Sequence, residues 1–88
     1  MKTLIKYKDA TGDWKAIFSY RHKGKYYTDL YIYNFSCCLP CFERFGHYEF
    51  SHKRLMKLLN IQSFNRVWNR KKIKRFLKCC DYHEYPWN

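Results

Sequence analysis

Glycine, proline and acidic side chains are scarce in this chain of 88 residues. Three glycines and two prolines leave no stretch that resembles a flexible linker, so the sequence predicts one folded domain over residues 1–88. No apolar run approaches the ~20 residues of a membrane span. The charged residue Lys2 follows Met1, as in a secretory signal, but the apolar pair Leu4-Ile5 is far shorter than the core of such a signal. We therefore expect an intracellular protein.

The shortage of acidic residues gives the chain a strongly basic balance. Seven Asp and Glu against eighteen Lys and Arg make a formal net charge of +11. No acidic residue occurs between Glu49 and Asp81, where ten Lys and Arg lie. This excess predicts an anionic partner, which could be nucleic acid, an acidic protein surface or an anionic membrane surface. A basic face that only keeps the protein soluble is the alternative.

Motifs for catalysis are absent from the sequence. Glu43, Glu49 and Glu84 form no spaced pair, and the chain has neither a glycine-rich phosphate loop nor a nucleophile elbow. We therefore expect a binding protein rather than an enzyme, and no small-molecule substrate.

All five cysteines lie in two short stretches, residues 37–41 and 79–80. Cys38 and Cys41 form a C-x2-C pair, and Cys80 and His83 form a C-x2-H pair. Together these four side chains offer the ligand set of a Cys3His zinc site. The sequence thus predicts a Zn²⁺ ion that supplements the small core of a short chain. The ion would be structural, because four protein ligands leave no position for a water molecule.

The cysteine pattern also allows other interpretations. Cys37 with Cys41, and Cys79 with His83, have i, i+4 spacing, so either pair could chelate instead. His47 lies close enough in sequence to be a substitute ligand. Free thiols buried as small hydrophobic groups are a second interpretation, and disulfides are a third. The odd number of cysteines and the reducing interior of a cell argue against disulfides.

The first third of the chain has the composition of antiparallel strands. The predicted strands are residues 3–8, 14–21 and 26–35. Lys23-Gly24 can form a two-residue hairpin loop in which glycine takes a positive φ. Residues 1–36 are therefore expected to form a three-stranded antiparallel meander.

The hairpin loop fixes the pairing of the second and third strands. Ala16 then faces Tyr31, and Tyr20 faces Tyr27. One face of this hairpin holds most of its large aromatic side chains, which are Trp14, Phe18, Tyr20, Tyr27, Tyr31 and Tyr33. We expect this aromatic face to be core, because large aromatic side chains dominate cores and the helices must pack somewhere. A surface that stacks unpaired bases is the alternative.

The remainder of the chain is expected to be mainly helical. It divides into a cysteine turn and loop (37–50), helices (51–80) and a tail (81–88). Ser51 can cap a helix from His52 to about Leu59, and Ser63 can cap a second helix. Phe64, Val67 and Trp68 share one face of this second helix, whereas another, displaced face holds Ile73, Phe76, Leu77 and Cys80. Either the helix bends at residues 69–72 or two shorter helices meet there. The predicted fold class is α+β: a small three-stranded antiparallel meander, a Cys turn and two basic helices, stapled by zinc.

The two predicted helices resemble a helix-turn-helix. In that arrangement Asn65, Arg66, Asn69 and Arg70 lie on the helix that reads the DNA groove. An αα-hairpin packed on the sheet is the alternative. The residues expected to contact phosphates or a partner are Arg66, Arg70, Lys71, Lys72, Lys74, Arg75 and Lys78.

These observations predict a small zinc-stabilised protein that binds DNA or RNA through a strongly basic helical face. The alternative is a phage or mobile-element accessory protein that inhibits a host nucleic-acid-processing or defence protein by direct binding. Exposed tyrosine, tryptophan and arginine are also the residues that dominate protein interfaces. Composition alone therefore does not separate the two functions.

Overall fold

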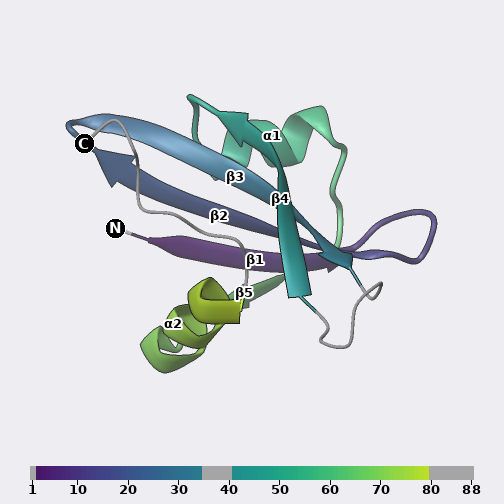
Figure 1. Ribbon diagram of the computed structural model, residues 1–88. Coiled ribbons are helices and arrows are strands. Elements are labelled where there is room, and N and C mark those ends of the chain that lie inside the picture. The colour runs from purple at the N-terminus through teal and green to yellow at the C-terminus, as the bar shows by residue number, and fades with distance from the viewer. Residues whose placement is uncertain (1, 35–40, 80–88) are drawn as a thin grey trace.

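The computed structural model describes residues 2–34 and 41–79 (Figure 1). The strands are β1 (Thr3–Lys8), β2 (Trp14–His22), β3 (Lys25–Asn34), β4 (Cys41–Tyr48) and β5 (Asn65–Val67), and the helices are α1 (His52–Leu58) and α2 (Arg70–Cys79). The five strands form one antiparallel sheet in the order β4-β3-β2-β1-β5. Sheet is therefore the main secondary structure of the residues described.

The hairpin of β2 and β3 has the register expected from the sequence. Ala16 pairs with Tyr31 and Tyr20 pairs with Tyr27. Lys23 and Gly24 form the loop with φ values of 50° and 80°. Two consecutive positive φ values are those of a type I′ turn, whose twist matches that of the strands it joins. The predictions for this loop and for the pairing are confirmed.

The predicted meander followed by two basic helices is wrong, because two further strands complete the sheet. The first is β4, in a segment that was expected to be a loop. Leu30 pairs with Gly46 and Tyr31 with Arg44, so that Phe45 is the extra residue of a bulge. The bulge and the charged residues beside it interrupt the alternation of apolar and polar side chains by which a strand is recognised.

The second additional strand is β5, in a segment that was expected to begin a helix at Ser63. Its three residues pair with β1, and Val67 lies opposite Leu4. Phe64, Val67 and Trp68 have helical spacing, but the segment gains its hydrogen bonds from the edge of the sheet instead. Helix α2 starts only at Arg70. The helix-turn-helix is therefore also wrong.

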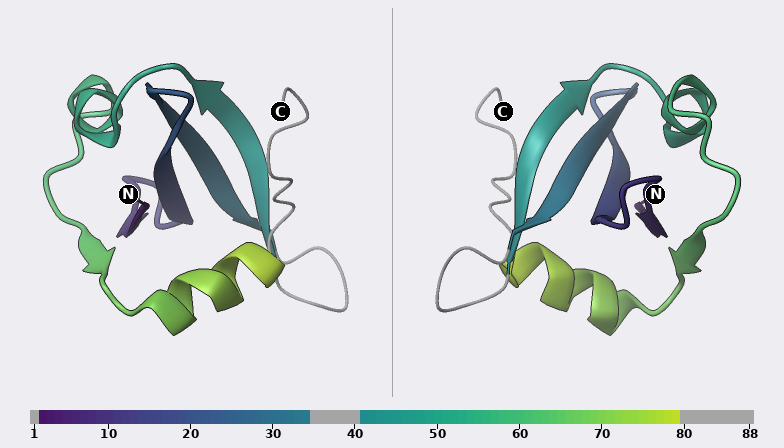
Figure 2. Two further views of the ribbon diagram at one scale, coloured as in Figure 1. Left: turned by 90° about the vertical axis from the view of Figure 1, so that its left-hand side faces the viewer. Right: turned by 90° about the vertical axis from the view of Figure 1, so that its right-hand side faces the viewer.

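Each face of the sheet is covered by one helix. The cluster on the first face consists of Leu4, Ala16, Phe18, Tyr20, Tyr27 and Tyr31, together with Ile73 and Phe76 of α2. The rings of Phe76 and Tyr31 meet edge to face with their centroids 5.4 Å apart. Figure 2 shows α2 on this side of the sheet and α1 on the other. The expectation that the aromatic face is core is confirmed for its four central residues, whereas Trp14 is 43% exposed.

The opposite face holds a smaller aliphatic cluster. It consists of Ile5, Tyr7, Ile17 and Leu30, together with Leu55 of α1. Helix α1 begins at His52 as expected, but Ser51 makes no side-chain hydrogen bond at the cap. Burial of Leu55 therefore holds this short helix in place more than its cap does.

Candidate functional site

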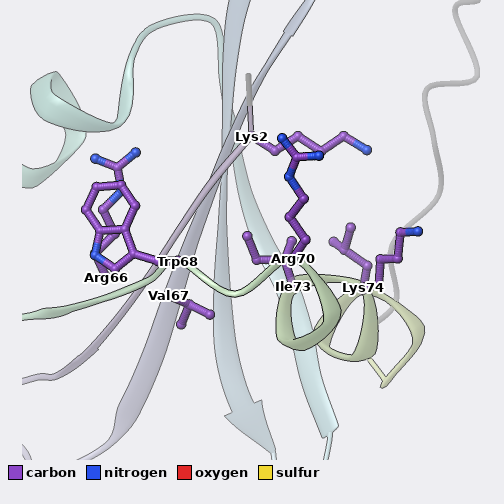
Figure 3. Close-up of a pocket in the computed structure, with 8 residues that line it drawn as sticks. Lys2, Arg66, Val67, Trp68, Arg70, Ile73 and Lys74 are labelled. Carbon is purple, nitrogen blue, oxygen red and sulfur yellow. The ribbon is translucent and has the colours of Figure 1, made fainter.

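A cleft opens between β5 and the start of α2 (Figure 3). Its volume is about 380 Å³, and its lining residues are Lys2, Arg66, Val67, Trp68, Arg70, Ile73, Lys74 and Leu77. Four of these side chains are cationic, the other four are apolar or aromatic, and none is acidic. The cleft can therefore hold a ligand that combines negative charge with a flat or apolar group.

The extended conformation of β5 arranges one wall of this cleft. Side chains alternate along a strand. Val67 packs against the core cluster below α2, which leaves its two neighbours to point away from the core. Arg66 and Trp68 consequently lie on the same side, with the guanidinium carbon of Arg66 3.9 Å from the centroid of the Trp68 ring. This distance is that of a close cation–π contact.

Arg66 and Trp68 are held differently by their surroundings. The guanidinium of Arg66 also donates a hydrogen bond to the hydroxyl of Thr3, over 3.4 Å from Nη2 to Oγ1. Trp68 is 73% exposed, although tryptophan is among the side chains with most to gain from burial. The site thus presents an exposed indole that is backed by a partly buried cation.

The start of α2 forms the second wall. Asn69 caps this helix, because its Oδ1 accepts hydrogen bonds from the backbone N–H groups of Lys71 and Lys72 at 2.9 and 3.3 Å. Arg70, Lys71 and Lys72 occupy the first turn, which contains no acidic residue. The helix macrodipole makes this end positive, so each cation here costs about 0.3–1 kcal/mol at low salt. An anionic ligand would remove that repulsion.

The seven predicted contact residues all lie on β5 or α2. Arg66 is on β5 and partly buried, whereas the exposed residues of α2 are Arg70, Lys71, Lys72, Lys74, Arg75 and Lys78. Arg66, Arg70 and Lys74 meet at the cleft, and the other four lie outside its lining. Within the described part of the chain, none of the seven forms an ion pair with a carboxylate.

Sequence reasoning assigned Arg66, Arg70 and Lys74 to a binding surface but missed the other lining residues of the cleft, among them Trp68 and Lys2. Trp68 was placed on the apolar face of a helix, and Lys2 was not considered. Lys2 comes to the cleft because β1 pairs with β5, which brings the start of the chain beside α2. The polar surroundings of Trp68, with Asn69 and Arg70 directly after it, were a signal that this tryptophan lies at the surface.

The zinc prediction lies mostly outside the described residues. Cys38, Cys80 and His83 are among the residues that the structure does not describe. Cys41 is the first residue of β4, and its side chain is likewise not described. A zinc site formed by these four residues stays a prediction.

A second polar cluster joins β3 to β4 and was also missed. Asp29 is fully buried, and His47, its partner across the strands, donates a hydrogen bond from Nδ1 to Oδ1 over 2.5 Å. Arg44 places a guanidinium nitrogen 3.8 Å from Oδ2. Burial raises the pKa of Asp29, and the hydrogen bond and charge of His47 oppose that rise. The signal was the position of Asp29 opposite Phe18, which puts a carboxylate on the aromatic face.

His47 thus contacts Asp29 and Tyr27 of the neighbouring strand. Its role as a substitute zinc ligand stays a prediction. Its ring stacks on Tyr27 with centroids 5.6 Å apart and its side chain is 31% exposed. The pair of Asp29 and His47 links the edge strand β4 to the interior of the sheet. The contact adds a side-chain link to the backbone ladder between β3 and β4.

Neither helix within residues 2–34 and 41–79 combines the length and the apolar character needed to cross a membrane. Comparisons of the chain with protein-family models, with curated proteins and with solved structures found no match.

Proposed function

We propose that this protein binds nucleic acid through the surface formed by β5 and α2. The observation that carries the proposal is the first turn of α2, where three cations without an ion-pair partner among the described residues lie at the positive end of the helix beside an exposed tryptophan. This arrangement opposes folding unless a polyanion binds there. Phosphate groups along a nucleic-acid strand supply a row of negative charges that such a surface could neutralise.

The distribution of charge supports a polyanion over a single small anion. Six exposed cations follow one another along α2, while Ile73 and Phe76 turn the opposite side of the helix into the core. Helix α2 thus presents one continuous basic surface that extends beyond the cleft. Each phosphate neutralised by such a surface releases counterions, so affinity should fall linearly with salt on logarithmic axes.

The direct test is fluorescence anisotropy of labelled single-stranded and duplex oligonucleotides over a range of salt concentrations. The double variant Arg70→Gln with Lys74→Gln removes two cations from the cleft. Each lost phosphate contact should lower the magnitude of the salt slope by about 0.7 for a single strand and about 0.9 for a duplex. Wild-type binding that shows no dependence on salt, or no binding to either oligonucleotide at low salt, would overturn the proposal.

A matched control is available on the other helix. Lys53 and Lys57 are exposed on α1, on the opposite face of the sheet, and their replacement by glutamine removes the same amount of charge. This control should weaken binding only through the general loss of net charge. If it lowers affinity as much as the variant of α2, the binding surface is not the one proposed.

A further inference from the structure

We infer that the cleft between β5 and α2 takes one unpaired base against Trp68, so that the protein prefers single-stranded nucleic acid to duplex. This inference rests on the proposed nucleic-acid binding and adds the class of substrate. The observation that carries it is that an exposed aromatic ring and several cations line the same cleft. Binding through the charge of α2 alone would not need an aromatic side chain there.

The two ends of the cleft have different chemistry. Figure 3 shows Trp68 and Arg66 together at one end, and Lys2, Arg70 and Lys74 at the other. A nucleotide has the same division, because its base is flat and aromatic and its phosphate is anionic. A base stacked on Trp68 would thus direct its phosphates toward the cations at the opposite end.

The platform is built to stay exposed and oriented. The guanidinium of Arg66 lies 3.9 Å from the centroid of the Trp68 ring and is also hydrogen-bonded to Thr3 of β1. Arg66 thus supports the indole from the sheet, while 73% of the Trp68 surface remains in contact with solvent. Stacking of a base would bury this surface, and a cation beside an aromatic ring strengthens such stacks.

The cations at the other end share one side of α2. Arg70 and Lys74 are four positions apart in the sequence, which places them one above the other on the helix surface. Both line the cleft, together with Lys2 from the segment before β1. They can therefore contact the phosphate of the stacked nucleotide and that of its neighbour.

The geometry favours an unpaired base over a duplex. In a duplex both faces of each base are covered by its neighbours, and only base edges are presented in the grooves. A base must leave the stack before its face can meet an indole, which costs a few kcal/mol in a duplex and little in a single strand. A volume of about 380 Å³ lies near the lower end of the range for ligand pockets, which suits one nucleotide rather than a helix.

The test compares two exposed tryptophans. Trp68→Ala removes the platform, and Trp14→Ala removes a tryptophan on β2 that is 43% exposed and lies outside the cleft lining. Affinity is measured by anisotropy with a labelled oligothymidylate and with a duplex hairpin. Trp68→Ala should lower affinity for the single strand by about 5- to 150-fold, because stacking on one side chain contributes that much per base. Trp68→Phe should recover part of the loss.

The salt slope, the affinity for the duplex and the comparison with Trp14→Ala separate the possible outcomes. Trp68→Ala should leave the salt slope and the affinity for the duplex close to those of wild type, because no phosphate contact is removed. If Trp68→Ala affects the single strand no more than Trp14→Ala does, or affects both nucleic acids equally, the stacking inference is wrong although nucleic-acid binding stands. If the wild type binds neither probe, the proposed function itself fails. Thermal denaturation of each variant checks that the fold is retained.

Discussion

Replacement of Asp29 by asparagine should change how the free energy of unfolding depends on pH, because Asp29 is a buried carboxyl group at the junction of β3 and β4. Asp29 is fully buried, and burial is the largest cause of its raised pKa. The hydrogen bond and charge of His47 and the charge of Arg44 act in the opposite direction and offset burial only in part. The ionised carboxylate is therefore less favourable in the folded chain than in the unfolded chain.

The sign and size of the effect follow from this raised pKa. Protonation of Asp29 contributes stability that is complete below the unfolded pKa of about 3.9 and is lost as the pH rises through the folded pKa. Each unit by which folding raises the pKa corresponds to about 1.4 kcal/mol of unfolding free energy. The amide of Asp29→Asn does not titrate. As the pH rises, the unfolding free energy of the wild type should therefore fall relative to that of Asp29→Asn. For a domain of this size, 1 kcal/mol changes the melting temperature by about 4–8 °C.

Urea denaturation at a series of pH values, followed by tryptophan fluorescence, measures this difference. Asp13→Asn, in the exposed turn between β1 and β2, controls for the loss of one negative charge. His47→Ala should steepen the pH dependence, since it removes the hydrogen bond that opposes the effect of burial. A difference between wild type and Asp29→Asn that stays constant with pH, or that grows in favour of wild type as the pH rises, would refute the reasoning.

Three other outcomes are expected. Native mass spectrometry should detect one zinc ion per chain that a chelator removes and that Cys41→Ser weakens, whereas a metal-free chain would contradict the zinc prediction. Phe76→Ala should lower the unfolding free energy by about 3–5 kcal/mol, because the ring is 6% exposed and fills the space between α2 and Tyr31. A loss below 1 kcal/mol in denaturant titrations would mean that α2 is not part of the core. Gly24→Ala should cost about 1–2 kcal/mol in the same assay, since the loop requires a φ of 80° there, and an unchanged midpoint would argue against the type I′ turn.

The parts of the fold that sequence reasoning predicted are those with local causes. Lys23-Gly24 requires positive φ values that glycine favours, and once the loop is fixed, alternation assigns every side chain of β2 and β3 to a face. The boundaries of β1 and the start of α1 at His52 follow from similar short-range signals. The aromatic core face could therefore be foreseen before any packing was known.

The parts that were missed depend on distant partners. A bulge at Phe45 interrupts the alternation in β4, and the strand is stabilised by its ladder to β3 rather than by its own pattern. In β5, the helical spacing of Phe64, Val67 and Trp68 was misleading because the edge of β1 supplies hydrogen bonds that a three-residue strand cannot obtain alone. Local propensity was overridden by tertiary pairing in both cases.

In the candidate site, too, the features with local causes could be predicted and those that depend on distant partners could not. Its cations could be found from the sequence, because an unbroken excess of positive charge needs no fold to be recognised. The cleft could not be found in this way. Trp68 reaches the surface only because β5 is extended, and Lys2 joins Arg70 only because β1 and β5 are neighbours in the sheet.

The central claim is that nucleic acid binds at β5 and the first turns of α2. Chemical-shift mapping by NMR, with ¹⁵N-labelled protein and a short single-stranded oligothymidylate, tests it most directly. We predict that the largest changes occur at the backbone amides of residues 65–78 and at the indole N–H of Trp68. Changes concentrated on α1, with β5 and α2 unaffected, would contradict the claim.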